Sequence, residues 1–233
     1  MGAALAGDFQ LARRRERDGE NVSVVLWDLD GTLVQTEHLR CKLENEVLAE
    51  FNIDPGPLLE GCAGMRTRDV LTRVLDAKGE GARLPEVMAR WHTLVLEHVV
   101  NRALPLRGIE RVLSDIPMRT HRFALVTSTD HDVADKILER FGWAWRFECV
   151  IGGDDVKEGK PAPEPYVLAC EKMGVRPENA LVVEDSIAGV SAAQAAGCRV
   201  AAVMGTELPE NLHAAEFVLS NAGALPGLLR MLS

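Results

Sequence analysis

The sequence predicts an α/β fold: a Rossmann-like parallel sheet core with helices on both faces, and an inserted all-helical cap domain. Short apolar runs rich in β-branched residues alternate along the chain with segments of helical apolar spacing. These runs lack the inside/outside alternation of a sheet with one wet face, as is typical of parallel strands covered on both faces. One long interval breaks this rhythm, because its apolar spacing is helical throughout.

The apolar runs are expected to form the strands of the sheet, and they run into Gly, Asp, Ser or Thr. They are Val22–Leu29, Phe123–Thr127, Cys149–Ile151, Ala180–Val183 and Val200–Val203. Helical patterns lie near residues 107–116, 130–140, 164–173, 187–196 and 223–232. Strand alternating with helix predicts an open α/β sheet.

The interval from residue 37 to residue 103 contains no convincing strand. Leu39, Leu43 and Val47 step by four, which is the spacing of one helix face. We therefore expect residues 37–103 to form the cap domain. Residues 21–36 and 104–233 are expected to form the core domain, and residues 1–20 a flexible, solvated extension.

Composition excludes several classes of partner. The chain has 233 residues, of which 47% are hydrophobic and 26% charged, as in ordinary soluble globular proteins. Its net charge is −9, from 26 basic and 35 acidic residues, so phosphate backbones and anionic lipid would repel it. We therefore expect no nucleic-acid partner and no membrane partner.

The cysteines predict a cytoplasmic location. The five cysteines form no CxxC pair and no zinc-spaced cluster, which is how a reduced cytoplasmic protein uses cysteine. No apolar run approaches the roughly 18 residues needed to cross a bilayer.

Residues whose side chains could take part in catalysis follow the predicted strands. Asp28 and Asp30 end the first apolar run, and two such acids cannot both be buried as unpaired charges. Taken alone, the pair also fits a turn or a helix cap. Hydroxyls follow another run at Thr127–Thr129, a lysine stands between Gly159 and Pro161, and a second acidic pair follows at Glu184 and Asp185.

These residue types together favour phosphoryl transfer. The carboxyl ends of the strands in an open α/β sheet meet at one edge, where ligands bind. Magnesium prefers oxygen ligands, while lysine and hydroxyl groups neutralise and hold a phosphate. A carboxylate can also act as the nucleophile, with a second acid moving the proton.

Four segments in order resemble the motifs of the haloacid dehalogenase (HAD) superfamily, in its branch with a helical cap, which includes β-phosphoglucomutase and phosphoglycolate phosphatase. They are Asp28–Val34, Thr127–Ser128, Lys160–Pro163 and Val183–Ser186. The resemblance implies that Asp28 is the nucleophile and Asp30 the general acid/base. It implies that Thr127 and Lys160 hold the transferring phosphoryl group, with a backbone donor at Ser128.

The resemblance also implies a Mg²⁺ site. Asp185 would bind the metal together with the Asp28 carboxylate and the Asp30 backbone carbonyl. Glu184 would help directly or through water. Since the resembling dehalogenases and phosphonate hydrolases carry no acid at the position of Asp30, these two reactions are disfavoured.

The cap leaves two reactions open. In the resembling mutases a histidine of the first cap helix and basic groups contact the substrate; here Arg40 stands at that position, with His38 close by. Arg66 lies in a loop that resembles the cap loop reaching the active site. His38 and Arg66 are therefore candidate substrate contacts, although each also fits a solvated surface residue.

The expected function is that of a Mg²⁺-dependent phosphatase that hydrolyses a small phosphorylated metabolite, such as a sugar phosphate, through an aspartyl-phosphate intermediate. The alternative is a β-phosphoglucomutase-like phosphosugar mutase. A third hypothesis is a binding protein that kept the fold and lost the chemistry, although the nucleophile, the lysine and the metal acids are all present. The protein is expected to be a monomer or a small homo-oligomer.

Overall fold

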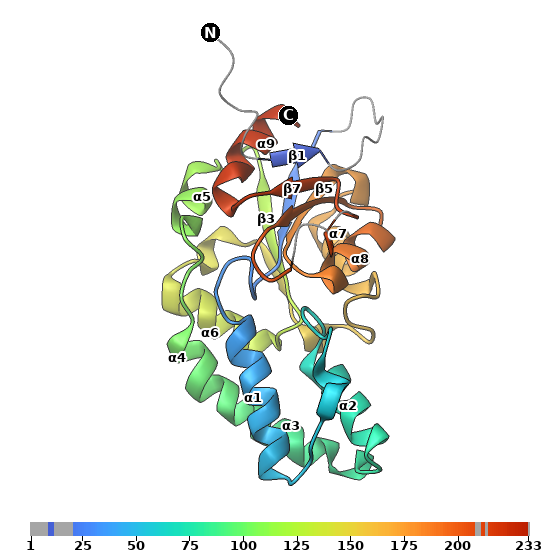
Figure 1. The fold of residues 1–233 in the computed structure, drawn as a ribbon. Helices are drawn as coiled ribbons and strands as arrows, with labels where there is room; N and C mark the ends of the chain where they lie inside the picture. The colour runs from blue at the N-terminus through green and yellow to red at the C-terminus, as the bar shows by residue number, and fades with distance from the viewer. Residues whose placement is uncertain (1–8, 12–20, 208–210, 213, 233) are drawn as a thin grey trace.

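The computed structural model describes residues 9–11, 21–207, 211–212 and 214–232. A seven-stranded sheet forms its centre, with the strand order β1-β7-β6-β5-β2-β3-β4 (Figure 1). The strands are β1 Phe9–Leu11, β2 Val24–Trp27, β3 Arg122–Val126, β4 Cys149–Ile151, β5 Ala180–Glu184, β6 Arg199–Val203 and β7 Phe217–Leu219. The predicted α/β class and the parallel core are confirmed.

The two strands at one edge of the sheet were not anticipated. Strand β7 pairs parallel with β6, while β1 pairs antiparallel with β7 and so lies inside the expected extension of residues 1–20. Its backbone completes the hydrogen bonding of an edge strand that would otherwise present unpaired groups. The rest of that extension, residues 1–8 and 12–20, lies outside the described residues.

Helices flank the sheet and form the insertion. They are α1 Glu37–Glu50, α2 Thr67–Ala77, α3 Leu84–Leu94, α4 Val100–Arg102, α5 Ile109–Asp115, α6 His131–Phe141, α7 Glu164–Met173, α8 Ile187–Ala195 and α9 Leu225–Met231. A π-helical turn, Val95–Val99, joins α3 to α4. No helix among the described residues is both long and apolar enough to span a membrane.

Alternate residues of each strand serve opposite faces of the sheet, as the pleat requires. Val25 and Trp27 pack with α5, α6 and α9 in one apolar cluster, whereas Val24 and Leu26 pack with α7 and α8 in the other. Both faces are therefore covered. This explains why the strand sequences show apolar runs instead of alternation.

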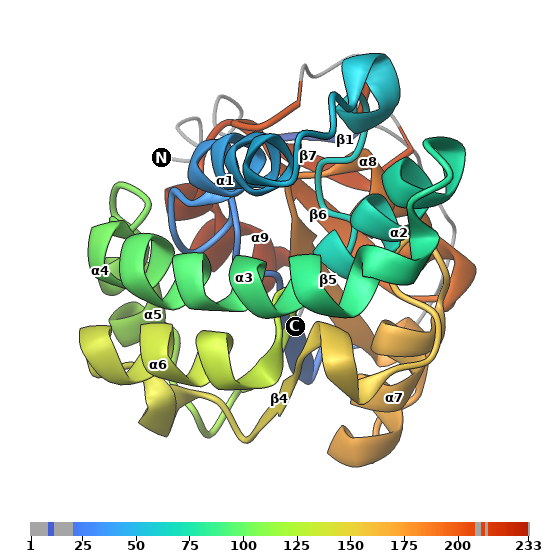
Figure 2. The ribbon, with the colours of Figure 1, turned by 90° about the horizontal axis from the view of Figure 1, so that it is seen from below.

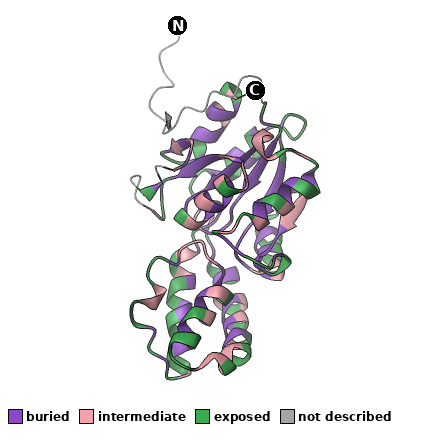
Figure 3. Ribbon diagram, turned by 90° about the vertical axis from the view of Figure 1, so that its right-hand side faces the viewer, coloured by how far each residue is buried: buried purple, intermediate pink, exposed green. Residues whose placement is uncertain are grey.

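Helices α1 to α4 form a body beyond one end of the sheet, and each stretch of this body contains both buried and exposed residues (Figure 3). Leu43 and Val47 of α1 belong to the same cluster as Val87 and Trp91 of α3. The four-residue spacing therefore marks the inner face of this helical insertion. The inserted helical cap of the predicted fold class is confirmed.

The two chain crossings between the bodies lie side by side. The backbone N–H of Gln35 donates to the carbonyl of Leu104, and that of Leu106 donates to Leu33, each at 2.8 Å. Helices α3 and α4 also run alongside α6 of the core (Figure 2). Arg140 of α6 donates to the carbonyls of Val100 and Ala103 at 2.7 Å, which ties the end of the insertion to the core.

A buried arginine holds the end of α5 against the sheet. Arg146 is 1% exposed, and its guanidinium lies 3.9 Å above the ring centre of Phe123. Its Nε donates to the carbonyl of Leu113 at 2.7 Å, and its Nη2 donates to Ile116. Because the last carbonyls of a helix have no partner within the helix, this side chain supplies the missing donors.

Replacing Arg146 by Met should lower the free energy of unfolding by about 2–4 kcal/mol, because buried carbonyl groups would lose their donors. Urea unfolding followed by circular dichroism would measure the loss. The matched control is Arg111→Met on α5, whose exposed ion pair with Asp115 should contribute less than about 0.5 kcal/mol. Equal stability of the two variants would contradict the role given to Arg146.

Candidate active site

The sheet order brings three predicted site residues to one edge. Strand β2 lies between β3 and β5, and all three are parallel. Asp28 follows β2 directly, Thr127 follows β3, and Glu184 is the last residue of β5. The carboxyl ends of the central strands therefore hold these side chains next to one another, at the end of the sheet that faces the helical cap (Figure 1).

Lys160 lies at the centre of the site. Its ammonium donates to Asp28 Oδ1 at 2.6 Å, to Glu184 Oε1 at 2.7 Å and to the carbonyl of Val126 at 3.0 Å. Burial lowers the pKa of Lys160, but the carboxylates of Asp28 and Glu184 outweigh it and raise the pKa well above its usual value. Lys160 therefore stays charged although it is only 1% exposed.

Glu184 is held on both of its carboxylate oxygens. Oε1 accepts from Lys160 and from the hydroxyl of Tyr166 at 3.1 Å, while Oε2 accepts from the backbone N–H groups of Asp185 and Ser186. Burial raises the pKa of Glu184, but Lys160 and Ser186 outweigh it and bring the pKa below its usual value. Gly189 leaves this carboxylate its space, since a Cβ there would collide with it. Glu184 thus anchors Lys160.

Asp185 offers a carboxylate oxygen without a settled partner. Oδ1 accepts from the hydroxyl of Thr32 at 3.0 Å. Oδ2 is buried and accepts no well-aligned hydrogen bond from any described residue, although the hydroxyl of Thr206 lies nearby. Gly31 has a positive φ of 89°, and a Cβ at this position would overlap Asp185 Oδ2. Only glycine therefore fits beside this carboxylate.

The acidic residues fit a divalent cation. Asp28, Glu184 and Asp185 each place one oxygen within 4.8 Å of the others. Burial raises the pKa of Asp28 well above its usual value although Lys160 opposes it, and burial together with Glu184 and Asp28 raises the pKa of Asp185. One lysine cannot balance three buried carboxylates. An oxygen-liganded cation would complete the balance and give Asp185 Oδ2 a partner.

Hydroxyl groups fix the orientation of Asp30. Thr36 donates to its Oδ1 at 2.5 Å, and Thr129 donates to its Oδ2 at 2.6 Å. Thr127 reaches the same Oδ2 at 3.4 Å and accepts from the backbone N–H of Thr129 at 3.1 Å. The second acid of the pair is therefore held in place from three sides, within reach of the predicted phosphate-binding hydroxyl.

Ser128 joins the site to the cap. Its hydroxyl donates to the carbonyl of Gly64 at 2.6 Å. Gly64, with a φ of 76°, lies so close to Ser186 that a Cβ would overlap the serine side chain. The loop that begins at Gly64 therefore rests directly on the strand ends.

Arg66 connects the cap to the core. Its Nη1 donates to the carbonyls of Gly153 and Val156 at 3.0 and 2.9 Å, and its Nη2 donates to that of Lys157 at 2.9 Å. Asp69 of the same helix accepts from its Nε and Nη2 at 2.7 and 2.9 Å. The guanidinium is thus committed to the loop beyond β4. Its predicted contact with substrate stays a prediction.

Arg40, and not His38, is the residue of the first cap helix that the structure brings to Asp30. Its Nη1 lies 3.4 Å from Asp30 Oδ2, while its Nη2 donates to Thr67 Oγ1 at 3.1 Å and to the carbonyl of Met65 at 3.3 Å. Arg40 is buried, whereas His38 is exposed. The predicted contact between His38 and substrate also stays a prediction.

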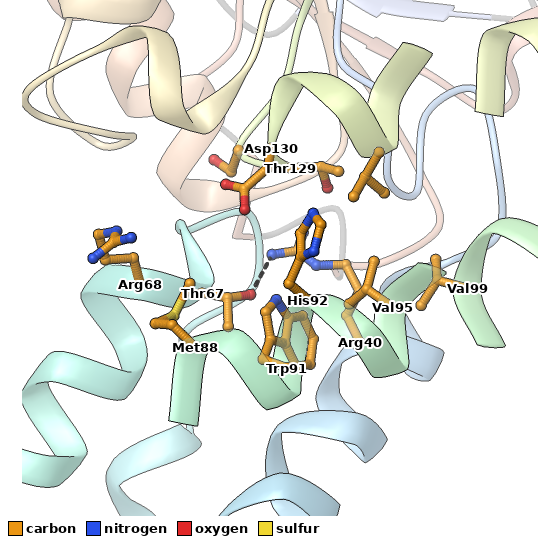
Figure 4. A pocket seen from close by; sticks show the side chains of 12 residues that line it. Arg40, Thr67, Arg68, Met88, Trp91, His92, Val95, Val99, Thr129 and Asp130 are labelled. Carbon is orange, nitrogen blue, oxygen red and sulfur yellow. Dashed lines mark hydrogen bonds between the residues drawn. The ribbon is translucent and has the colours of Figure 1, made fainter. Parts of the chain in front are cut away.

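A small cavity of about 20 Å³ lies between the cap and the core (Figure 4). Arg40 and Thr67 of the cap line one side of it, and Ser128, Thr129 and Asp130 of the core line another. The cavity therefore lies next to Asp30.

Sequence reasoning missed Arg40, Thr36 and Tyr166 as site residues, and it noted Thr129 only as part of a hydroxyl run. The sequence feature that could have identified Arg40 is its place at the position of the histidine in the resembling mutases. Thr36 precedes the first cap helix, and Tyr166 is the only tyrosine of the chain. The spacing of Thr36 and Tyr166 in the sequence does not show that Thr36 contacts Asp30 or that Tyr166 contacts Glu184.

The chain is similar to known proteins in sequence and in fold. Residues 25–203 match the family model described as haloacid dehalogenase-like hydrolase. A phosphoglycolate phosphatase of Xylella fastidiosa is 31% identical over 178 residues, which cover 74% of this chain and 76% of that protein. The fructose-1-phosphate phosphatase YqaB of Escherichia coli is 29% identical over 76% of this chain and 94% of its own length.

A solved structure supports the same assignment. The crystal structure of CbbY from Rhodobacter sphaeroides, in complex with phosphate, is similar with a TM-score of 0.71 and 26% identity. The similarity covers 88% of this chain and 96% of that one. The chain therefore belongs to the haloacid dehalogenase-like hydrolase family, and within it to the helical-cap branch that includes phosphoglycolate phosphatase and β-phosphoglucomutase.

Proposed function

We propose that this protein is a Mg²⁺-dependent phosphatase that hydrolyses a small phosphorylated metabolite through an aspartyl-phosphate on Asp28. The observation that carries the proposal is the buried ammonium of Lys160, shared between Asp28 and Glu184, beside a carboxylate oxygen of Asp185 that accepts no well-aligned hydrogen bond from a described residue. This arrangement offers a nucleophile, a fixed positive charge and metal ligands within one small volume.

In the first step Asp28 attacks phosphorus. A bond forms between a carboxylate oxygen of Asp28 and the phosphorus atom, and the bond from phosphorus to the alcohol oxygen breaks. Asp30 donates its proton to the departing alcohol. Lys160 and the hydroxyl of Thr127 hold the oxygens of the transferring group, and the rigid hydrogen bonds of Glu184 keep Lys160 in place.

In the second step the enzyme is regenerated. Asp30 takes a proton from a water molecule whose oxygen bonds to phosphorus, and the bond from phosphorus to Asp28 breaks. Phosphate leaves, and Asp30 is protonated again. Asp28, Asp185 and the Asp30 carbonyl, helped by Glu184, would hold Mg²⁺, which when bound would offset the negative charge of the phosphoryl group.

The cap, for which we propose residues 37–103, would select the substrate and exclude water. Arg66, Ser128 and Arg140 tie it to the core. According to their names, the relatives described above act on phosphoglycolate and on fructose 1-phosphate. A small phosphorylated metabolite is accordingly the proposed substrate class.

Asp28→Asn should reduce turnover by at least about a thousandfold, because the amide cannot form the aspartyl-phosphate. Phosphate release would be measured on a panel of phosphorylated metabolites, with Mg²⁺ and with a chelator. Circular dichroism would confirm that the variant is folded. A folded and fully active variant would exclude this mechanism, and isomerisation of a hexose 1-phosphate without phosphate release would favour the mutase.

Lys160→Met should abolish activity and also lower the free energy of unfolding by about 3–5 kcal/mol, because the variant leaves buried carboxylates without their partner. Adding Asp28→Asn to Lys160→Met should recover part of that loss, since the substitution removes one of the unpaired charges. Urea unfolding of both single variants and of the double variant gives the coupling. Strictly additive losses would show that the ion pair does not carry the stability.

Mg²⁺ should raise the melting temperature more at about pH 8 than at about pH 5.5, since metal ligands must be deprotonated. The pKa values of Asp28 and Asp185 are raised in the folded protein, so the fold holds protons that the unfolded chain has released. Their contribution to stability without metal therefore falls as the pH rises.

Asp185→Asn is the matched variant for this measurement. It should remove most of the Mg²⁺-dependent increase in melting temperature and weaken the pH dependence of the metal-free protein. An increase of the same size in the variant and the wild type, at both pH values, would place the metal elsewhere.

A further inference from the structure

A groove of about 750 Å³ lies between helices α5 and α9, which pack against one another on one face of the sheet (Figure 1). Its lining comes from the stretches 107–115 and 221–230. None of the residues that line it belongs to the site around Lys160. Pockets for small organic molecules have about this volume, whereas the cavity beside Asp30 measures only about 20 Å³. The groove therefore has room for a ligand and has no part in the proposed function.

The lining of this groove is positively charged. Three arginines contribute to it from three places in the chain: Arg107 before α5, Arg111 on α5 and Arg230 on α9. The acidic residue of the lining is Asp115, which lies 3.2 Å from Arg111. Three basic residues and one acidic residue leave an excess of two positive charges, although the chain as a whole carries −9. Since salt screens charges beyond roughly 8–10 Å, this local excess decides which ligand the groove attracts.

Two of these arginines are available to a ligand. Arg107 and Arg230 are exposed, and neither forms a hydrogen bond or an ion pair with another described residue. A Cβ at Gly227 would approach only Arg230 Nη2, at 3.8 Å, so the guanidinium of Arg230 lies over the part of α9 that lines the groove. A guanidinium binds phosphate oxygens through paired hydrogen bonds. A ligand with several phosphate oxygens can therefore engage both arginines.

A second cavity, of about 350 Å³, adjoins the groove, since Asp115, Pro226 and Arg230 line both. Burial and the charge of Arg146 lower the pKa of His121, which lines this cavity, so its imidazole is neutral at pH 7. The rest of the lining is uncharged and comprises Ile116, Pro117, Thr120 and Leu229. The adjoining cavity therefore suits an uncharged ring, and Arg230 stands where the two spaces meet.

We propose that the groove between α5 and α9 binds a nucleoside di- or triphosphate, with its phosphates against Arg107 and Arg230 and its base in the adjoining cavity. Such a molecule joins several phosphate groups to an uncharged ring, and the two spaces offer a fitting environment for each part. An inorganic phosphate or an acidic peptide would use the arginines and leave the adjoining cavity unused. The proposal goes beyond the proposed function, because no residue of the groove takes part in breaking the phosphate ester.

The first test compares a whole nucleotide with its parts. Isothermal titration calorimetry would measure the binding of ATP, of adenosine and of inorganic tripolyphosphate to the Asp28→Asn variant, with a chelator present. These conditions prevent hydrolysis and remove Mg²⁺-dependent binding at the strand ends. We expect ATP to bind at least about tenfold more tightly than either part, because each part fills only one of the two spaces. No saturable binding of ATP up to about 5 mM, or equally tight binding of tripolyphosphate, would overturn the proposal.

The second test removes the charges of the groove. Adding Arg107→Met or Arg230→Met should weaken ATP binding by about tenfold, because each substitution removes a charged hydrogen bond. Arg102→Met is the matched control, since Arg102 of α4 is also exposed, pairs with no described residue and lines a different cavity. It should leave the Kd within about twofold. An equal loss in all three variants would show that only the net charge of the protein matters, and would contradict a site in the groove.

The third test fills the groove without changing a charge. Gly227→Met suits the helix, and the new side chain has open space at its base. It should weaken ATP binding by about tenfold or more, with circular dichroism confirming that the variant is folded. Unchanged binding would place the nucleotide elsewhere. Because every test measures binding to a variant without the nucleophile, a failure to hydrolyse any phosphorylated metabolite would refute the proposed function and leave this result intact.

Discussion

The buried ion pair network of Lys160 is the constraint on which the site depends. An ammonium removed from water is costly unless carboxylates compensate it, and here Asp28 and Glu184 both do so. Each carboxylate is then fixed in turn, since Tyr166 and the backbone after β5 hold Glu184. The network joins the ends of β2 and β5 to the loop before α7. The site can therefore form only when β2 and β5 are neighbours in the sheet.

Two buried arginines, Arg66 and Arg40, make different contacts at the boundary between cap and core. Arg66 satisfies backbone carbonyls of the loop after β4, and it thereby fixes where the cap sits. Arg40 lies 3.4 Å from Asp30 and donates to Thr67 and to the carbonyl of Met65, so it links helix α1 to Asp30 and to the start of α2. Both are buried and both come from the cap, but Arg66 binds backbone carbonyls of the core whereas Arg40 lies beside the carboxylate of Asp30.

Much of the fold could be predicted because apolar runs and helical apolar spacing are features of short, continuous segments of the chain. The predicted range for β4 matches the structure, and α7 begins and ends where its helical pattern does. Strands β1 and β7 escaped prediction, and β1 owes its strand pairing to β7, which lies near the other end of the chain. The acids and hydroxyls of the motifs could be picked out because they end or follow apolar runs, and parallel strands bring such residues to one edge of the sheet.

What the sequence could not provide were contacts between distant side chains. Arg146 has the sequence context of an ordinary basic residue, yet it donates to the carbonyls of Leu113 and Ile116 at the end of α5. Arg66 was a candidate substrate contact, and its hydrogen bonds to residues 153–157 depend on how the cap packs against the core. No periodicity encodes such a contact. It follows from the three-dimensional packing of two bodies that are continuous only at two crossings.

Those two crossings have a consequence for how the protein could evolve. Because Leu33–Gln35 and Leu104–Leu106 are hydrogen-bonded neighbours, the insertion leaves and re-enters the core at nearly the same point. A tight turn between them would close the chain without altering the strand order. The insertion could therefore change in length and sequence while the residues at the strand ends of the core stay in place.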